Sequence, residues 1–510
     1  MTKNSVPVLP SSSANSQRRQ RPMSKTDTGR IAESIGPLLA EHPDETGVLP
    51  LTDSQEAFAA RIQLAEQAEF TLDLQYYIWR NDRTGALMFE AIHKAADRGV
   101  KVRLLLDDIN TAGMDSVLTG LQSHANIEIR LFNPLRIRWP RFINYLYDFP
   151  RINRRMHNKA FIVDGQLLIS GGRNISDEYF GATDDLLFAD LDALMIGDVV
   201  TRVADLFQQF WDCDSAVPLG ELMTLVRPQS LAKLSERASV VESDPGARDY
   251  VEAIEKLSFF KKVREHELDF VWAETEMVCD APSKGLGKAK PHQLIGHQLQ
   301  KAVGEPASHI NLVSPYFVPT RVGVDQLVKY AEQGIEIAIL TNSLAATDVA
   351  VVHAGYAKWR KRLLRAGIQL FELQRLSPLA RRQERKQRRQ RMKGKKGRFG
   401  SSASSLHAKT FEIDHERVFF GSFNFDPRSA QLNTELGFVI HSCKLARMIA
   451  KEFSKTVPHY AYKIALVDNK IVWEERLGRE VTRYHQEPSA SLWRRAATRV
   501  LERLPIDWLL

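Results

Sequence analysis

Two segments of the chain repeat histidine, lysine, aspartate and asparagine at one spacing. In each, a lysine follows the histidine by two positions, an aspartate by seven and an asparagine by seventeen: His157, Lys159, Asp164 and Asn174, then His407, Lys409, Asp414 and Asn424. An imidazole can attack phosphorus or protonate a leaving oxygen because its unperturbed pKa lies near neutrality. An ammonium and a carboxamide suit phosphate oxygens. One histidine cannot do both jobs in one step, so the pattern predicts a single phosphoryl-transfer site built from both segments.

The repetition of the whole pattern carries more weight than either copy. A lone His-x-Lys-x4-Asp match is not rare in a long chain, and a lone histidine on an apolar strand is usually a packed or surface residue. Both copies here continue into a glycine-led segment that ends in asparagine, at 171–174 and 421–424. The matching continuation favours function over coincidence.

The elements around both copies also match. Each half of the chain shows an apolar strand, a helix that ends in glycine, and a second strand, at 70–79, 86–99 and 100–108 and again at 309–317, 324–334 and 335–343. Each half then runs to a third apolar strand that carries the motif. Alternating strands and helices predict an α/β fold, and the duplication predicts two such units that face one another.

A hairpin is expected to assemble each motif. Histidine and lysine, two residues apart on a strand, point to the same face. Asp164-Gly165 is a strong signal for a two-residue hairpin turn. Counting back from such a turn in both copies gives these facing pairs: His157 with Gly172, and His407 with Ser422. The small residue in each pair would leave room for a phosphate.

The two aspartates are the weakest candidates for chemistry. The motif as a whole supplies six candidate catalytic residues: His157, Lys159, Asp164, His407, Lys409 and Asp414. Asp164 and Asp414 fall at an odd offset from the histidine and at the start of a turn. An aspartate in that place more often shapes the backbone than reacts.

At these residues the chain resembles the phospholipase D superfamily, whose double signature is HxKx4Dx6GSxN. The likeness extends from about residue 46 to 480. It implies two phospholipase D-like α/β lobes related by pseudo-twofold symmetry, with mixed sheets flanked by helices. It also implies one site at their interface that uses neither a metal ion nor another cofactor. The family forms a covalent phosphohistidine, so His157 would be the nucleophile and His407 the general acid and later the base.

The same resemblance assigns supporting roles. The family also places an acid beyond each motif that orients a catalytic histidine, and the candidates are Asp192 in FADLDALMIG and Glu435 in LNTELGFVI. Each lies in an apolar strand, where an unpaired carboxylate would be costly. Gly172 departs from the family, which usually has serine there, as at Ser422. Four polar residues would hold the phosphate: Lys159, Lys409, Asn174 and Asn424.

Within the superfamily the chain most resembles bacterial cardiolipin synthases, particularly their type C branch. The resembling segments include FNPLR, RRMHNKAFIVDG, FADLDALMIG, LVSPYFVP and GSFNFDPRS. This likeness implies transfer of a phosphatidyl group onto phosphatidylglycerol, with phosphatidylethanolamine as a further candidate substrate. The residues leave the acceptor open, because water and an alcohol need the same catalytic groups. A phospholipase D hydrolase that releases phosphatidic acid is therefore the alternative; the donor headgroup, the nucleophilic histidine and the oligomeric state also stay open.

A nuclease of the same superfamily is less favoured because of how charge is distributed. The formal net charge is +8, but residues 381–398 hold eleven Lys and Arg against one acid, a local charge of +10. The rest of the chain carries 8 − 10 = −2 and lacks a broad basic surface for nucleic acid. We expect no stable nucleic-acid binding. A non-catalytic membrane scaffold is disfavoured because both His-Lys-Asn sets are intact.

The cysteines and the hydropathy of the sequence indicate in which cellular compartment the protein acts. Cys213, Cys279 and Cys443 lie far apart and without metal-ligand spacing, which argues against a zinc site or disulfides and fits a reducing compartment. The sequence shows no run of about 18 apolar residues and no apolar core of a secretory signal. Any membrane role is therefore expected to be peripheral, on the cytoplasmic side of a bacterial inner membrane.

Repeats and composition divide the chain into five expected parts. These are a disordered segment 1–45, a first lobe 46–215, a connecting segment 216–285, a second lobe 286–480 with a basic insertion 381–404, and an amphipathic C-terminal helix 488–510.

Three segments could contact an anionic membrane. In 488–510 the apolar residues form one helical stripe, which suits an interfacial helix and equally a helix docked on the protein's own core. The stretch 137–150, IRWPRFINYLYDFP, suits a lipid-contacting loop or ordinary packing. The insertion 381–404 could attract anionic lipid or stay solvated.

Overall fold

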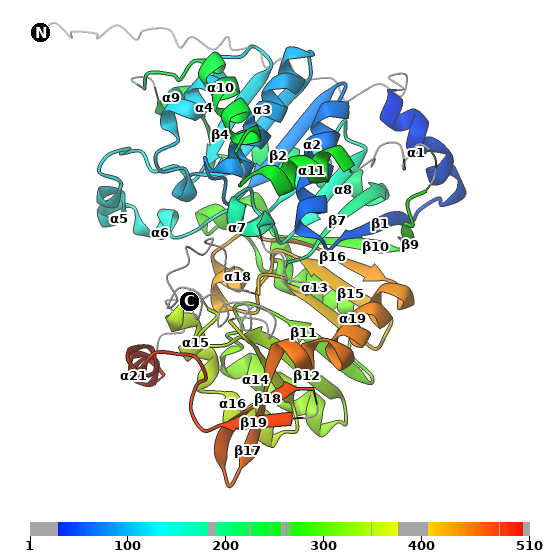
Figure 1. The fold of residues 1–510 in the computed structure, drawn as a ribbon, viewed down its shortest axis with the longest axis vertical. Coiled ribbons are helices and arrows are strands. Elements are labelled where there is room, and N and C mark those ends of the chain that lie inside the picture. The colour runs from blue at the N-terminus through cyan, green and yellow to red at the C-terminus, as the bar shows by residue number, and fades with distance from the viewer. Residues whose placement is uncertain are drawn as a thin grey trace, which may run out of the picture.

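The structure is a computed structural model that describes residues 29–181, 190–223, 226–244, 246–256, 267–347, 349–375, 406–478 and 480–502, with Lys262 and Glu265. The predictions for 1–28, for the insertion 381–404 and for 503–510 fall outside the described residues. Within them the chain forms two α/β lobes, one above the other in Figure 1.

Within the described residues, the first lobe is built on a nine-stranded mixed sheet of order β8-β4-β3-β2-β5-β6-β7-β1-β9. The strands β2, β3 and β4 are parallel, whereas β5, β6 and β7 run antiparallel to their neighbours. The strands of this sheet are β1 (Thr46–Leu51), β2 (Thr71–Tyr76), β3 (Lys101–Asp107), β4 (Ile127–Phe132), β5 (Ala160–Val163), β6 (Leu167–Gly171), β7 (Asp192–Gly197), β8 (Ala216–Pro218) and β9 (Val271–Ala273).

The second lobe repeats this arrangement. Its described residues form a ten-stranded sheet of order β10-β16-β15-β14-β11-β12-β13-β17-β18-β19, in which β11 to β16 match β2 to β7 in order and direction. The strands are β10 (Thr275–Cys279), β11 (His309–Val313), β12 (Glu336–Asn342), β13 (Gln369–Leu373), β14 (Thr410–Ile413), β15 (Arg417–Gly421), β16 (Leu436–His441), β17 (Ala461–Val467), β18 (Lys470–Leu477) and β19 (Glu480–Tyr484). The predicted duplicated α/β fold is confirmed.

Helices cover both faces of the two sheets. In the first lobe they are α1 (Arg30–Glu41), α2 (Ser54–Gln67), α3 (Arg83–Asp97), α4 (Asp115–Gln122), α5 (Asn144–Tyr147), α6 (Phe149–Ile152), α7 (Asp177–Phe180) and α8 (Asp198–Trp211), followed by α9 (Leu219–Leu222), α10 (Leu231–Glu242) and α11 (Arg248–Lys256). In the second lobe they are α13 (Ile295–Val303), α14 (Thr320–Glu332), α15 (Ala350–Ala357), α16 (Arg360–Arg365), α18 (Pro427–Gln431), α19 (Cys443–Lys455), α20 (Val457–Tyr460) and α21 (Leu492–Leu501).

Strand β3 shows how one sheet serves two cores. Its residues Val102, Leu104 and Leu106 pack into the core on the outer face of the first lobe, whereas Leu105 packs into a core shared by both lobes. This is the near-continuous apolar sequence expected of a parallel strand covered on both faces. The shared core fixes one lobe against the other.

Two helices supply much of the shared core. Helix α8 contributes Phe207 and Phe210, and helix α19 contributes Ile449 and Phe453. Each helix carries its apolar residues at helical spacing, so one face is buried. Because the apolar faces of α8 and α19 are buried in the same cluster, the interface between the lobes is itself a hydrophobic core.

The N-terminal part of the chain corrects one expectation. Residues 1–45 were predicted to be disordered, but residues 30–41 form α1, with Ile31 and Ile35 buried in the first lobe's core. Arg30 Nε also pairs with Oε1 of Glu69 at 2.6 Å. Two apolar residues four positions apart are enough to bury one face of a short helix. The prediction missed this helix because the sequence around it is mostly polar.

The connecting segment 216–285 contributes strands to both sheets. Strand β9 pairs with β1 of the first sheet, whereas β10 pairs with β16 of the second.

Within the described residues, no helix is long and apolar enough to cross a lipid bilayer.

The predicted two-residue hairpin turns are wrong by one residue. Val163 pairs with Leu167, and Ile413 pairs with Arg417, so each turn holds three residues. The first turn places Asp164 and Gly165 at positive φ, 51° and 65°. Such a backbone also suits a three-residue loop. The longer turn moves every facing pair of the hairpin by one residue. Gly172 is therefore not directly opposite His157, and Ser422 is not directly opposite His407.

Candidate active site

The backbones of the two lobes meet at His157. The residue before it, Met156, forms an isolated parallel bridge with Thr434 of the second lobe. The N–H of His157 donates to the carbonyl oxygen of Thr434 at 2.9 Å. The first motif therefore begins on a contact between lobes before it enters β5.

The imidazole of His157 is oriented by the second lobe. Its Nδ1 lies 2.8 Å from Oε2 of Glu435, and both side chains are buried. The Ser422 hydroxyl donates to the same carboxylate oxygen. With Nδ1 held by a carboxylate, Nε2 is the nitrogen left for chemistry.

The imidazole of His407 is oriented by the first lobe in the reverse sense. Its Nδ1 lies 2.7 Å from Oδ2 of Asp190. Each histidine thus depends on an acid from the other lobe. The two motifs form one site, as the sequence predicts.

The prediction that Asp192 orients a catalytic histidine is wrong. Its Oδ2 lies 2.7 Å from Nη2 of Arg61, and its Oδ1 accepts the Arg173 N–H at 3.1 Å. Strand register explains the error: Gly171 pairs with Asp192 and Gly421 with Gly437, so the position that matches Glu435 is Asp190, two residues before Asp192. Asp192 neutralises buried arginines instead.

Asp190 also explains why glycine stands at position 172. A Cβ on Gly172 would lie 2.0 Å from Oδ1 of Asp190, well inside contact distance. The second lobe keeps Ser422 at the matching position, and its hydroxyl bonds Glu435. Glycine therefore replaces the usual serine at position 172 because the side chain of Asp190 occupies the space that a Cβ would need.

Two lysines place positive charge beside the histidines. Nζ of Lys159 donates to the His157 carbonyl oxygen at 2.6 Å, and Nζ of Lys409 lies 3.2 Å from both ring nitrogens of His407. Burial, together with repulsion from Lys409, lowers the pKa of Lys159 to about 7. Burial likewise lowers the pKa of Lys409 to about 8. Two buried ammoniums that repel one another favour an anion between them.

The ionisation of the histidines and acids follows from the same burial. Burial and the charge of Lys159 hold the pKa of His157 well below its ordinary value, and burial with Lys409 lowers that of His407. Burial raises the pKa of Glu435 to about 7, against the attraction of Lys159. For Asp190 burial acts in the same direction, but His407 and Lys409 outweigh it and hold its pKa below the ordinary range. These shifts favour the neutral form of both imidazoles.

The two asparagines are buried within the site's framework. Oδ1 of Asn174 accepts the N–H of Ile78 at 3.0 Å, and the Asn424 N–H donates to the Ser429 hydroxyl at 3.3 Å. Asn174 thereby fastens the segment after β2 to the one after β6. The role predicted for both carboxamides at a phosphate stays a prediction.

The motif aspartates lie in the turns at the far ends of the hairpin strands. Asp164 accepts the N–H groups of residues 69, 70 and 71 at 2.8–3.0 Å. Asp414 accepts those of residues 307, 308 and 309 at 2.7–3.2 Å. Both therefore hold the start of a neighbouring strand, and their place among the candidate catalytic residues reflects the signature rather than contact with the site.

Two tyrosines that the sequence did not single out contact the histidines. The ring of Tyr77 lies edge-on to His157 with centroids 4.9 Å apart, and Tyr179 lies edge-on to His407 at 5.0 Å. Both come from the first lobe. Tyr77 follows the apolar strand β2 and Tyr179 lies in the short helix α7, and neither setting is rare enough to have marked the residue in the sequence.

Potential metal ligands gather elsewhere. Within the described residues, two groups have donor atoms close enough to share an ion, and neither includes a motif histidine: His309, Glu412 and His415, then His353, Glu372 and Glu487. The expectation of chemistry without a metal or cofactor stays a prediction.

Comparison with known proteins agrees with this geometry. A crystal structure of phosphatidylserine synthase from Haemophilus influenzae Rd KW20 superposes with a TM-score of 0.56 at 12% identity, over 94% of this chain and 99% of that one. At that identity the likeness concerns the fold alone. Each of the two lobes also matches a PLD-like domain in sequence, so the chain is a phospholipase D-like protein.

Sequence comparison narrows the class. The family model described as "Cardiolipin synthase, PLD-like domain" matches residues 61–211 and 297–457, one segment in each lobe. Cardiolipin synthase C of Escherichia coli (strain K12) is 47% identical over 482 residues, 94% of this chain and 100% of that protein. An uncharacterized protein of Helicobacter pylori (strain J99) is 31% identical over 453 residues, 88% of this chain and 86% of that protein. The chain belongs to the cardiolipin synthase family of phospholipase D-like proteins.

Proposed function

We propose that the protein is a phosphatidyltransferase that makes cardiolipin by moving a phosphatidyl group, through a phosphohistidine, onto phosphatidylglycerol. The observation that carries this proposal is the reciprocal pairing of His157 with Glu435 and of His407 with Asp190 across the lobes. It provides two oriented imidazoles in one site, as a two-step transfer requires. The identity to a cardiolipin synthase over nearly the full length supports the lipid substrate.

In the first step Nε2 of His157 attacks the phosphorus of a phosphatidylglycerol donor. The bond between phosphorus and the headgroup oxygen breaks, and protonated His407 donates its proton to that oxygen, so glycerol leaves. The phosphatidyl group stays on His157. The ammoniums of Lys159 and Lys409 stabilise the charge on the phosphate oxygens.

In the second step His407, now neutral, accepts the proton of a primary hydroxyl on another phosphatidylglycerol. That oxygen attacks the phosphorus, the phosphorus–nitrogen bond to His157 breaks, and the product has one glycerol between two phosphatidyl groups. His407 ends protonated and His157 neutral, as at the start. The proton balance closes over the two steps.

The asymmetry of the site supports this division of roles. The pKa of His157 is depressed furthest by burial and the two lysines, which keeps it neutral for attack. His407 pairs with Asp190, whose pKa lies below the ordinary range, so an ionised carboxylate accompanies it. The phosphate of a bound substrate adds negative charge near both imidazoles and raises their pKa. His407 is thus the better-supported proton carrier.

Peripheral attachment to an anionic membrane, on the cytoplasmic side of a bacterial inner membrane, is part of the proposal. It is supported by the name of the relative from Escherichia coli, cardiolipin synthase C, and by the exposed apolar side chains of loop 137–150 and helix α21. Phosphatidylethanolamine is a second candidate substrate. Contact with nucleic acid is not part of the proposed function.

The test is product analysis on defined lipids. Purified full-length protein is incubated with vesicles of phosphatidylglycerol, with and without phosphatidylethanolamine, and lipids and released headgroups are identified by mass spectrometry. We expect cardiolipin and glycerol from phosphatidylglycerol alone, and neither from His157→Ala or His407→Ala. Phosphatidic acid as the sole product would instead make water the acceptor. DNA cleavage without lipid turnover would overturn the proposal.

A further inference from the structure

The loop 137–150 turns its aromatic side chains to solvent. Six large apolar residues within eleven positions are exposed, led by Trp139 at 88%: Trp139, Phe142, Tyr145, Leu146, Tyr147 and Phe149. Burial of apolar surface is favourable, so a cluster of this kind marks a contact surface. Of the two interpretations that the sequence left open, ordinary packing is excluded for these side chains.

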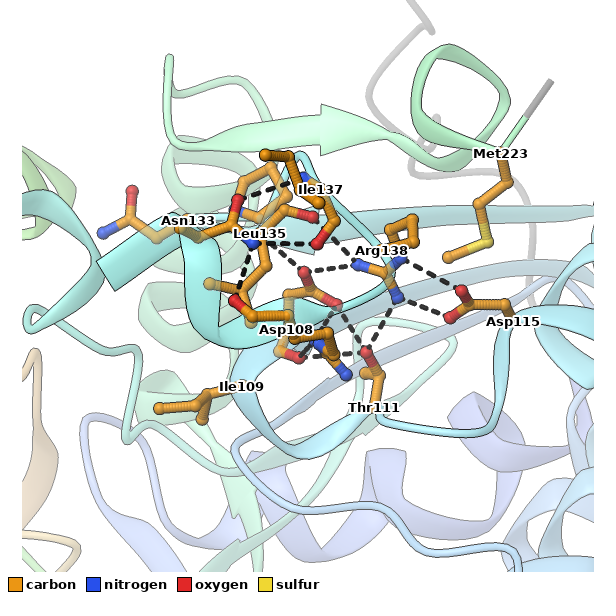
Figure 2. A network of polar contacts seen from close by, with 12 residues as sticks. Asp108, Ile109, Thr111, Asp115, Asn133, Leu135, Ile137, Arg138 and Met223 are labelled. Atoms are coloured by element: carbon orange, nitrogen blue, oxygen red, sulfur yellow. Dashed lines mark hydrogen bonds and ion pairs between the residues drawn. The ribbon is translucent and has the colours of Figure 1, made fainter. Parts of the chain in front are cut away.

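The polar side chains of the same loop point inward and brace it. Nη1 of Arg138 lies 2.6 Å from Oδ2 of the fully buried Asp108, and its Nε lies 3.0 Å from Oδ2 of Asp115, as Figure 2 shows. Buried Asn144 bonds both the N–H and the carbonyl oxygen of Ile137, at 3.0 and 2.8 Å. Breaking a buried pair is costly, so these contacts hold the exposed aromatic residues in place.

Helix α21 is turned in the same way. Its apolar residues Leu492, Trp493 and Val500 are 76%, 86% and 61% exposed, whereas its polar residue Thr498 is buried. Arg494 reaches inward to donate to the Thr347 carbonyl oxygen at 2.8 Å. A helix docked on its own core buries the apolar face, so this orientation favours the interfacial interpretation.

The two elements lie on the same side of the molecule. Figure 1 shows α5 and α6, within and beside the loop, projecting from the first lobe, and α21 projecting from the second lobe on that side. The loop also leads into the active site, because His157 follows Phe149 by only eight positions. That stretch can span at most about 29 Å when extended.

We propose that the exposed faces of loop 137–150 and helix α21 dock together on the surface of an anionic phospholipid bilayer. The exposed charge specifies this partner. Arg138 and Arg141 pair with buried acids, but Arg136 beside them is exposed. Helix α21 holds three arginines and no acid, and its Arg499 is exposed. Aromatic rings beside arginines suit the boundary between headgroups and acyl chains of an anionic leaflet. The inference rests on the proposed function in that the bilayer also holds the substrates.

The experiment measures vesicle binding of the full-length protein. Vesicles of phosphatidylglycerol and phosphatidylcholine are sedimented with the unmodified protein, with Trp139→Ser/Phe142→Ser, with Leu492→Ser/Trp493→Ser, and with all four changes. We expect the partition coefficient to fall about tenfold for each pair and about a hundredfold for all four. The matched control Val240→Ser/Val481→Ser removes exposed apolar residues outside both elements and should change binding less than about twofold.

Salt separates apolar docking from simple charge attraction. At about 0.5 M salt the screening length is only a few ångströms, so surface electrostatics weakens while apolar insertion persists. The ratio between the unmodified protein and the fourfold variant should therefore persist at that salt. Quenching of tryptophan fluorescence by brominated acyl chains should fall in Trp139→Phe, which keeps a ring at this position.

Activity in detergent micelles separates this inference from the proposed function. The fourfold variant should keep its micellar rate within about twofold while its rate on vesicles falls with binding. Unchanged vesicle binding by that variant, in an otherwise active protein, would overturn the docking inference alone. Loss of self-association in the same variant, with vesicle binding intact, would assign the face to a second copy and overturn it as well. An unmodified protein that binds vesicles but turns over no lipid would instead remove the proposed function.

Discussion

Oε2 of Glu435 in the second lobe lies 2.8 Å from Nδ1 of His157 in the first, and Asp190 of the first lobe holds His407 of the second at 2.7 Å. Neither lobe by itself contains an oriented motif histidine. The shared core between α8 and α19 therefore serves catalysis directly, because it sets the distance between each histidine and its acid.

The two neighbouring acids Asp190 and Asp192 should respond differently to the same change. Asp190→Asn should lower kcat about 100-fold with little effect on melting temperature, since it weakens the support of His407. Asp192→Asn should lower the free energy of unfolding by about 3 kcal/mol, because it leaves Arg61 and Arg173 without their buried carboxylate. Steady-state kinetics and thermal unfolding of both variants check this. Equal losses of kcat at equal stability would contradict the assignment.

Gly172→Ser restores the usual signature residue and should nevertheless impair the enzyme. The added Cβ would meet Oδ1 of Asp190 and displace it from His407. We expect a fall in kcat of roughly 100-fold. Gly172→Ala should behave alike, because the Cβ rather than the hydroxyl is responsible. A gain of activity in Gly172→Ser would show that the site has room that the structure lacks.

Glu435→Gln should change how stability depends on pH. Burial raises the pKa of Glu435 from 4.5 to about 7, so folding favours its protonated form. Its stabilising contribution is complete below pH 4.5 and is lost as pH rises through about 7. The variant lacks this titration, so its stability relative to the unmodified protein should rise by up to about 1 kcal/mol per pH unit across that window. Denaturant unfolding at several pH values measures it; a parallel pair of curves would contradict the buried, titrating carboxyl.

The buried lysines predict the alkaline limit of activity. With the pKa of Lys159 at about 7 and that of Lys409 at about 8, the free enzyme loses positive charge as pH rises through this range. The kcat/KM should therefore fall as pH rises above about 7, with apparent pKa values that belong to the pair rather than to either lysine. Lys159→Arg keeps the charge at the position with the lower pKa and should move the limb toward about pH 8, the pKa of Lys409. An unchanged limb in that variant would assign it to other groups.

The elements that carry the site were predictable because they are local. Apolar periodicity identified β2, α3 and β3 and their counterparts β11, α14 and β12, and the repeat predicted that the lobes match. The turn role suggested for Asp164 also agrees with its contacts to three backbone N–H groups. Spacing along one strand is enough for such inferences.

What could not be predicted depends on contacts between distant segments. Asp190 and Asp192 stand two residues apart on an apolar background, and only the pairing of Gly171 with Asp192 shows which one matches Glu435. Helical periodicity gave α21 its apolar stripe but not the direction that the stripe faces. The dipeptide Asp164-Gly165 marks a turn but does not fix its length. Only the pairing of the flanking strands shows that the turn holds three residues.

The most direct test of the central claim, covalent transfer by one histidine with the other as proton carrier, is mass analysis of a trapped intermediate. His407→Asn is mixed with phosphatidylglycerol, quenched, digested and examined for a phosphatidyl group on histidine. We predict an adduct on His157, absent from the double variant His157→Ala/His407→Asn. An adduct on His407 in His157→Asn, with none on His157 in the reverse variant, would contradict the assigned roles, and no adduct in either alongside full activity of the unmodified protein would contradict the covalent route.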